Sequence, residues 1–303
     1  MWWRAKCAEL QPADWQVLDM AYPSQVRVER SDGQSFLFGG QDWSLYGLTG
    51  LDAADYAVFT EDRGSGDGGI ITGRRVAART IEIKGRNRNT PNNAANRAAA
   101  LAFFNPKLDY KIYITYLGRT RWIAGVVEKA SCPFRNVYAL QLLTVSFLCV
   151  EPYLLSVDDF GRDIAADEPR WGWPYMDNLT YKTIVSKFAY SGSVHIDYDG
   201  DAEADLRMTL SAAGKVVNPK IVKGDSFVRV LHTMEKGDVI EIVTSPTPTV
   251  KLNGDNILNQ VDRLSRFAPL KVQPGGNDYS YEADYGDNVL HVVLHYYNHY
   301  LGV

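Results

Sequence analysis

The chain has 303 residues, a formal net charge of −4 and an ordinary globular composition, with 46% apolar and 22% charged residues. That length suggests about two domains, and the mild acidity argues against nucleic-acid binding as the main role, because duplex-binding proteins usually carry a strong basic excess. We therefore expect no sequence-specific nucleic-acid binding. The longest nearly apolar stretch, residues 138–150, is shorter than the roughly 20 residues of a spanning helix, so we expect no membrane insertion either.

Predicted strands dominate the first half of the chain. Two alternating runs flank a Ser-Asp-Gly step at 31–33, which is typical of a β-hairpin. Residues 51–60 are ambiguous between a strand and a helical turn, and the glycine-rich stretch 63–69 predicts a flexible loop. The remaining strands are predicted at 74–84, at 109–117 and 120–128 as a hairpin around Gly118-Arg119, and at 138–150 as one or two buried strands.

One helix is predicted at about 91–104. Thr90 can cap it, Pro91 suits the first helical position, and Pro106 stops it, because the residue before a proline is pushed out of the helical region. One face of this helix carries mostly small residues, which suits close packing on a sheet. The residues of that face are Ala94, Ala98, Leu101 and Ala102, and Phe104 or Asn105 extends it.

The composition changes between about 151 and 183, where three prolines, several acids and two tryptophans predict a connection between two domains. After it, short predicted strands recur with turn residues between them and no comparable helix, which is typical of a β-sandwich. These strands are expected at 193–198, 205–211, 227–232, 239–243, 249–252, 277–285 and 289–297. The sequence therefore predicts a mainly β protein with a β-rich N-terminal domain and a C-terminal sandwich.

Several patterns could carry chemistry, but each fits a structural role better. The glycine run 64–69 fits Gly-x-Gly-x-x-Gly, yet a strand follows it where a dinucleotide site needs a helix. The acidic run 197–205 lacks the glycine and glutamate that an EF-hand loop requires, although a looser cation site or a glycosidase carboxylate pair stays open. We expect no cofactor and no metal site.

The histidines and cysteines do not indicate a metal site or a disulfide framework either. His291, His295 and His299 recur every four residues, but on a strand the first two would lie about 13 Å apart, too far for one metal ion, so we expect three exposed histidines. The three cysteines, at positions 7, 132 and 149, lie far apart without a Cys-x-x-Cys pair, and we expect them to be buried. Because no catalytic signature is present, the chain is not expected to be an enzyme; a hydrolase is a remaining alternative.

Several segments, taken in order, follow a known pattern. In the first half these are GGIITGRRVAARTIEIKG, RAAALAFFNP, YITYLGRTRWIAGVVE and VSFLCVEPYL. In the second half they are YDGDAEADLRMTL, AAGKVVNPKI, VKLNGDNIL and LKVQPGGNDY. Together they resemble the distal tail protein (Dit) family of long-tailed, non-contractile bacteriophages over about residues 15–303. The start, MWWRAKCAEL, and the joint PRWGWPYM match nothing in that pattern.

The resemblance implies a domain plan and a role. Residues 1–155 would form a ring-building β-rich barrel or sandwich with one helix, and 156–303 a linker followed by a galectin-like β-sandwich. The protein would be a virion structural component that forms a homohexameric ring at the tail tip. The ring would join the tail tube protein to the tail-associated hub protein and the receptor-binding proteins, and its bore would let DNA pass.

Candidate functional residues follow from this expectation. Arg63, Gly64 and Asp67, in the glycine-rich loop, and Gly118 and Arg119, in the predicted hairpin, are candidates for contacts within the ring or with the tube. The alternative function is a carbohydrate-binding module that contacts host cell-wall sugars, for which Trp171 and Trp173 would form the aromatic platform. Since the start of the chain lacks the apolar core of a signal peptide, we expect synthesis in the bacterial host cytoplasm.

Overall fold

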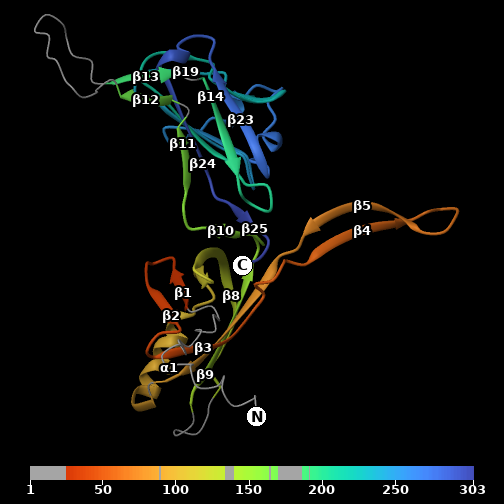
Figure 1. Ribbon diagram of the computed structural model, residues 1–303, viewed down its shortest axis with the longest axis vertical. Helices are drawn as coiled ribbons and strands as arrows, with labels where there is room; N and C mark the ends of the chain where they lie inside the picture. Colours follow the sequence, from red (N-terminus) through yellow and green to blue (C-terminus); the bar gives the residue numbers. More distant parts are fainter. Residues whose placement is uncertain (1–24, 89, 134–139, 164, 170–185, 191) are drawn as a thin grey trace, which may run out of the picture. The chain divides into compact units, whose positions relative to one another are not determined.

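The computed structural model shows two compact units, Met1–Leu154 together with Leu301–Val303, and Leu155–Tyr300. The residues that the structure describes are 25–88, 90–133, 140–163, 165–169, 186–190 and 192–303 (Figure 1). The predicted mainly β fold with one α-helix is confirmed for these residues. No helix among them is long and apolar enough to cross a membrane.

Unit 1 is built on an antiparallel sheet with the strand order β2-β1-β7-β8-β9-β6-β3 (Figure 1). Both predicted hairpins of this region are present, as β1–β2 and β7–β8. The strands are β1 (Gln25–Arg30), β2 (Ser35–Phe38), β3 (Trp43–Thr49), β6 (Arg79–Asn87), β7 (Asp109–Tyr116), β8 (Arg119–Ser131) and β9 (Leu142–Cys149).

Alternation along these strands places one set of apolar side chains in the core of unit 1, because successive residues of a strand point to opposite faces. Strand β7 shows the pattern, with Tyr110, Ile112 and Ile114 buried. An aromatic cluster fills the space between the sheet and the helix, and its members include Phe36, Phe38, Trp43, Phe103, Phe104, Tyr110 and Phe147. Gly85 makes room for this cluster, since a Cβ there would lie 2.7 Å from Phe38 Cε1.

The predicted helix is present as α1 (Asn93–Phe103), preceded by the 3-10 turn η1 (Thr90–Asn92). The four residues expected to pack on the sheet, Ala94, Ala98, Leu101 and Ala102, are instead exposed. Of the two residues expected to extend that face, Phe104 is buried and Asn105 is exposed. The buried residues of the helix are Asn93, Ala100 and Phe103. The aromatic cluster sets the orientation, because Phe103 packs against Phe36 and Tyr110, and a large ring buries far more apolar area than a methyl group.

Residues that follow the second unit return to unit 1. The Arg79 side chain is only 5% exposed, and it donates from Nη1 to Gly50 O and Asp52 O, at 3.4 and 3.3 Å. Its Nη2 donates to Leu301 O at 2.7 Å, and Arg121 donates to Gly302 O. A buried guanidinium is thus held by backbone carbonyl groups, one of which comes from 222 residues further along the chain.

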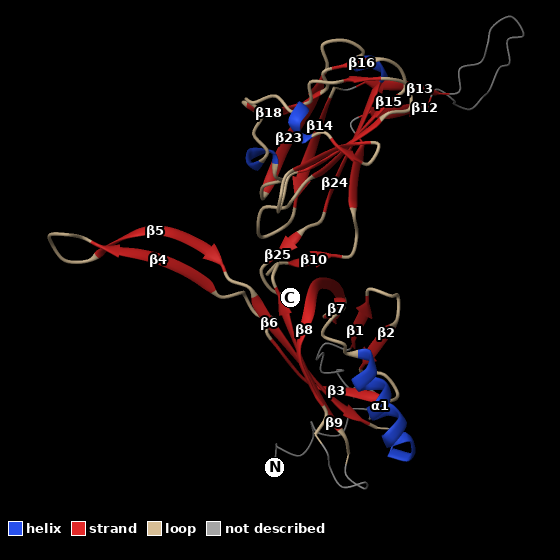
Figure 2. Cartoon of the chain, turned by 180° about the vertical axis from the view of Figure 1, so that it is seen from behind, coloured by secondary structure: helices blue, strands red, loops and turns tan. Residues whose placement is uncertain are grey.

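The two larger sheets of unit 2 are both antiparallel (Figures 1 and 2). One has six strands: β11 (Phe160–Asp163), β24 (Leu290–Tyr296), β15 (Arg207–Ala212), β20 (Val239–Val243), β21 (Thr249–Leu252) and β22 (Asp255–Asn256). The other has four strands: β14 (Ser193–Tyr198), β23 (Gly275–Glu282), β17 (Lys220–Lys223) and β18 (Ser226–Arg229). The remaining elements are short: β10 (Leu154–Ser156), β12 (Ala165–Pro169), β13 (Ser186–Tyr190), β16 (Val216–Val217), β19 (Thr233–Met234), β25 (His299–Tyr300), η2 (Leu258–Gln260), η3 (Ala268–Leu270) and η4 (Asp287–Val289).

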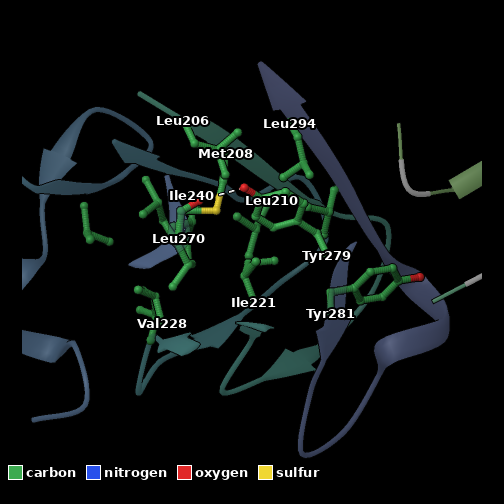
Figure 3. Packing of buried hydrophobic residues seen from close by; sticks show 14 of the residues in the cluster. Leu206, Met208, Leu210, Ile221, Val228, Ile240, Leu270, Tyr279, Tyr281 and Leu294 are labelled. Atoms are coloured by element: carbon green, nitrogen blue, oxygen red, sulfur yellow. Dashed lines mark hydrogen bonds between the residues drawn. The ribbon is translucent and has the colours of Figure 1, made fainter. Parts of the chain in front are cut away.

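The core of unit 2 lies between its two sheets, as Figure 3 shows. Met208, Leu210 and Leu294 come from the six-stranded sheet, and Ile221 and Tyr279 from the four-stranded one. The buried Tyr279 hydroxyl donates to a main-chain carbonyl oxygen at 2.8 Å, so its polar atom is satisfied inside an apolar core. This arrangement is a β-sandwich.

The stretch expected to connect the domains is only partly described. Its described residues form β10, β11 and β12, and β11 pairs with β24 in the six-stranded sheet. Trp171 and Trp173 lie outside the described residues, as do Cys7 and the rest of the joint between 170 and 185. Of the predicted buried cysteines, Cys132 and Cys149 are buried and free.

Candidate assembly surface

A two-stranded arm is the most unusual feature of unit 1. Within the part of the chain that the structure describes, strands β4 (Tyr56–Asp62) and β5 (Gly69–Val76) pair only with each other, and both views show them extending beyond the end of the main sheet (Figures 1 and 2). The single strand predicted at 74–84 is therefore wrong, since the chain breaks between β5 and β6. Ala77 N donates to Asp55 O at 2.7 Å there, which closes the base of the arm.

Large apolar side chains of the arm lie in solvent. Neighbouring residues of a strand point to opposite faces, so Val58 and Phe59, like Ile70 and Ile71, expose apolar surface on both sides of the ribbon. The exposed fractions are 59% for Tyr56, 53% for Val58, 48% for Phe59, 56% for Ile70 and 50% for Ile71. An isolated two-stranded hairpin is marginally stable in water, and grouped exposed apolar residues mark interaction sites. The arm therefore exposes apolar side chains of the kind that usually lie buried in a core or an interface.

The tip of the arm holds three of the predicted contact residues, Arg63, Gly64 and Asp67. Arg63 N donates to Gly68 O at 3.3 Å, which closes the loop, and Gly68 has φ 86°, a conformation that favours glycine. The tip surrounds an open hollow of about 460 Å³, and all residues from 63 to 68 are exposed. The tip of the arm thus exposes one positively charged side chain, Arg63, and one negatively charged side chain, Asp67.

The other two predicted contact residues, Gly118 and Arg119, lie on a separate element. Strands β7 and β8 are joined by a two-residue turn, Leu117-Gly118, with φ 47° and 78°. Such a turn suits the twist of a hairpin, but positive φ is costly for leucine. Leu117 is also 69% exposed, so the turn carries both backbone strain and exposed apolar surface. Leu117 was predicted only as the last residue of the strand 109–117, although its place beside Gly118 in a short turn was a signal for an exposed position.

The acidic run is dispersed in the structure. Lys271 Nζ lies 3.2 Å from Asp205 and 3.7 Å from Glu203, while Asp197 Oδ1 lies 3.1 Å from Nε2 of His195. His195 also contacts Asp278, and the two carboxylates raise its pKa, Asp278 contributing most. Among the described residues no group of three or more His, Cys, Asp or Glu side chains is placed to hold a metal ion.

The three C-terminal histidines do not form one site. His291 and His295 lie on strand β24, as predicted, with Leu290, Val292, Leu294 and Tyr296 buried on the opposite face. Both are partly exposed rather than fully exposed. His299 lies on β25, where burial lowers its pKa, so the expectation of three exposed histidines is wrong.

The comparisons with known proteins bear on both units. Residues 199–300 match the family model described as siphovirus-type tail component, C-terminal domain. None of the curated proteins matches the chain. A solved structure titled as SPP1 Dit (gp 19.1), a paradigm of the hub adsorption apparatus in phages that infect Gram-positive bacteria, has a TM-score of 0.63 at 15% identity. The superposition covers 90% of this chain and 98% of that one.

A second structure shares the fold less closely. A chain of the phage P2 baseplate, in its activated conformation with calcium, has a TM-score of 0.52 at 10% identity and covers 90% of this chain and 97% of its own. The fold is thus shared with both structures over 90% of this chain, and the siphovirus-type tail component family model matches residues 199–300 of the sandwich. The resemblance of the sequence to the distal tail protein family is thereby confirmed, and the family model places it in residues 199–300.

Proposed function

We propose that this protein is a structural component of the virion tail tip that forms a homohexameric ring. The ring joins the tail tube protein to the tail-associated hub protein and the receptor-binding proteins, and its bore lets DNA pass. The protein is made in the bacterial host cytoplasm and has no enzymatic activity. The family match and the titles of the similar structures support the hub role, and the arm supports assembly.

The β4–β5 arm is the observation that carries the proposal. A closed ring of identical copies requires each subunit to offer two different surfaces, because its interfaces are heterologous. The arm supplies one of them, since its apolar side chains are exposed and are not covered by the described residues of its own unit. Arg63 and Asp67 at its tip are then expected to make polar contacts at the rim of the same interface, where charged groups stay hydrated.

Burial of a single arm side chain would already make a measurable contribution to the interface. Phe59 leaves roughly 100 Å² of ring exposed if a phenylalanine offers roughly 200 Å², which corresponds to about 2.5 kcal/mol on burial. Losing that contribution would weaken one interface by roughly 70-fold. Since a closed hexamer repeats the interface at every junction, the effect on ring stability accumulates.

Light scattering followed by negative-stain imaging tests the proposal. Six copies would give a particle of roughly 200 kDa with a central hole. The arm variants Phe59→Ser and Ile70→Ser should shift the population toward smaller species. Leu264→Ser is the matched control, because Leu264 is 75% exposed on unit 2, away from the arm in sequence and in a different unit.

Two outcomes would contradict the proposal. One is a ring that assembles unchanged in both arm variants, which would contradict the role of the arm in the interface although not the ring itself. The other is a chain that stays monomeric at high concentration and also forms no ring when mixed with the tail tube protein. A loss of assembly in the Leu264→Ser control alone would place the interface on unit 2 instead.

A further inference from the structure

An open hollow of about 750 Å³ lies on unit 2, between the turn that leads into β16 and the loop that joins β23 to β24. Its volume falls within the range of small-molecule sites in proteins. Six of its lining residues supply the groups that matter: Gly214, Lys215, Asp284, Tyr285, Asp287 and Asn288. Ring assembly does not account for this hollow, and none of the residues expected to bind sugars lies in it.

Tyr285 presents an aromatic ring to solvent at this hollow, with 66% of the residue exposed. Its backbone is held firmly: Val217 N donates to Tyr285 O, and Asp284 N donates to Val217 O, both at 2.9 Å. The next residue, Gly286, has φ 81°, and a Cβ there would lie 2.1 Å from Lys215 O. Only glycine permits this close approach, so the ring projects from a loop that is fixed before any ligand arrives.

Polar groups of both kinds surround the ring. The Asp284 carboxylate accepts a hydrogen bond from Asn218 Nδ2 at 2.7 Å and another from Arg229, and these two partners lower its pKa. It is therefore an oriented, ionised acceptor. In the described part of the chain, the side chains of Lys215, Tyr285 and Asn288 have no hydrogen-bonding or ionic partner, so their donors and acceptors are available to a ligand.

We propose that this hollow binds a neutral pyranose saccharide. A sugar ring has an apolar face of C–H groups, which can pack on the Tyr285 ring, and a rim of hydroxyl groups, which both donate and accept hydrogen bonds. Asp284 would accept from one hydroxyl, while Lys215 and Asn288 would donate to others. The carboxylates of Asp284 and Asp287 disfavour phosphorylated or acidic sugars, because like charges repel.

Binding of simple glycosides to the full chain tests this assignment. The probes are the methyl pyranosides of glucose, galactose, mannose and N-acetylglucosamine, followed by isothermal titration calorimetry and ligand-observed NMR. At least one should bind with a Kd of about 1 mM, as a small, largely solvent-facing ligand would. Tyr285→Ala should weaken that binding roughly tenfold through the lost packing, whereas Tyr285→Phe should retain most of it.

Controls locate the site and identify the ligand class. Leu264→Ala, at another exposed apolar residue of unit 2, should leave binding unchanged. Glucose 1-phosphate should bind more weakly than the neutral glycosides. The proposal is overturned if none of the four glycosides binds, if Tyr285→Ala binds as well as the unaltered chain, or if the phosphorylated sugar binds best. Ring assembly should be the same in all these variants, so the result is separable from the assembly proposal.

Discussion

Removing residues 301–303 should destabilise unit 1, although these residues follow unit 2 in the chain. The reason is Arg79, whose guanidinium is buried and whose pKa burial lowers. Its Nη2 hydrogen bond to Leu301 O, at 2.7 Å, is the shortest of its three contacts with carbonyl groups, and its Nε is buried without a partner. A charged group that is already incompletely paired would lose its best acceptor.

The magnitude follows from the cost of such a loss. A hydrogen bond from a charged donor contributes about 2 kcal/mol, and the partly exposed contact between Arg121 and Gly302 adds about 1 kcal/mol. The deletion should therefore lower the free energy of unfolding by about 3 kcal/mol. For a unit of this size, that corresponds to a fall in melting temperature of roughly 6–12 °C.

Native-state hydrogen exchange is the appropriate assay, because it reports stability locally. Protection of the β3 and β6 amides should fall in the deletion variant, while the amides of β15 and β20 in unit 2 should be unaffected. A double-mutant cycle with Arg79→Met isolates the contact: without the buried charge, the same deletion should cost only about 1 kcal/mol. Deleting Val303 alone is the control.

The decisive number is the coupling energy between the Arg79 guanidinium and the returning segment. If the deletion lowers the stability of unit 1 equally in the unaltered chain and in the Arg79→Met variant, the guanidinium does not recognise that segment and the reasoning is refuted. A coupling energy below about 0.5 kcal/mol, the range in which independent sites are additive, would establish that result.

Three other changes have defined outcomes. Gly85→Ala should cost about 1–3 kcal/mol in thermal unfolding, because its Cβ would overlap the Phe38 ring, whereas Gly64→Ala, with open space around it, should be close to neutral. Leu117→Gly should raise the melting temperature, because it relieves about 1 kcal/mol of positive-φ strain. The same substitution should weaken assembly if the turn contacts a partner. An unchanged melting temperature would contradict the claim that Leu117 is strained. Burial raises the pKa of Cys149 to about 12, so its thiol should resist Ellman's reagent at pH 8 until the chain unfolds. The contribution of the protonated thiol to stability should be lost as the pH rises from about 9 toward 12. Rapid reaction of Cys149 in the folded chain would contradict this prediction.

The elements that the sequence predicted well are those with a local signal. The β1–β2 and β7–β8 hairpins have alternating strands around short turns, and α1 has a proline near each end. The arm was harder, because apolar residues on both faces of β4 and β5 remove the alternation that marks a half-buried strand. The prediction of the buried face of α1 was wrong for a different reason, because that face is set by the contacts of Phe103 with aromatic rings of β2 and β7.

Sites that depend on long-range contacts could not be predicted at all. Arg79 resembles any strand arginine until Gly50, Asp52 and Leu301 are brought around it. Tyr285 was predicted at the end of the strand 277–285, whereas β23 ends at Glu282 and the backbone of 215–217 fixes the position of Tyr285. In contrast, the exposed loop at 63–68 was found from local composition, since a run of glycines between strands predicts such a loop whatever surrounds it.

The return of residues 301–303 to unit 1 has a consequence for biosynthesis. A ribosome delivers the chain in order, so β6 with its buried arginine emerges long before the carbonyl group that completes its environment. Between those two moments the whole of unit 2 must be translated. Unit 1 can reach its final stability only in chains translated past unit 2, which would bias assembly of the tail tip against prematurely terminated products.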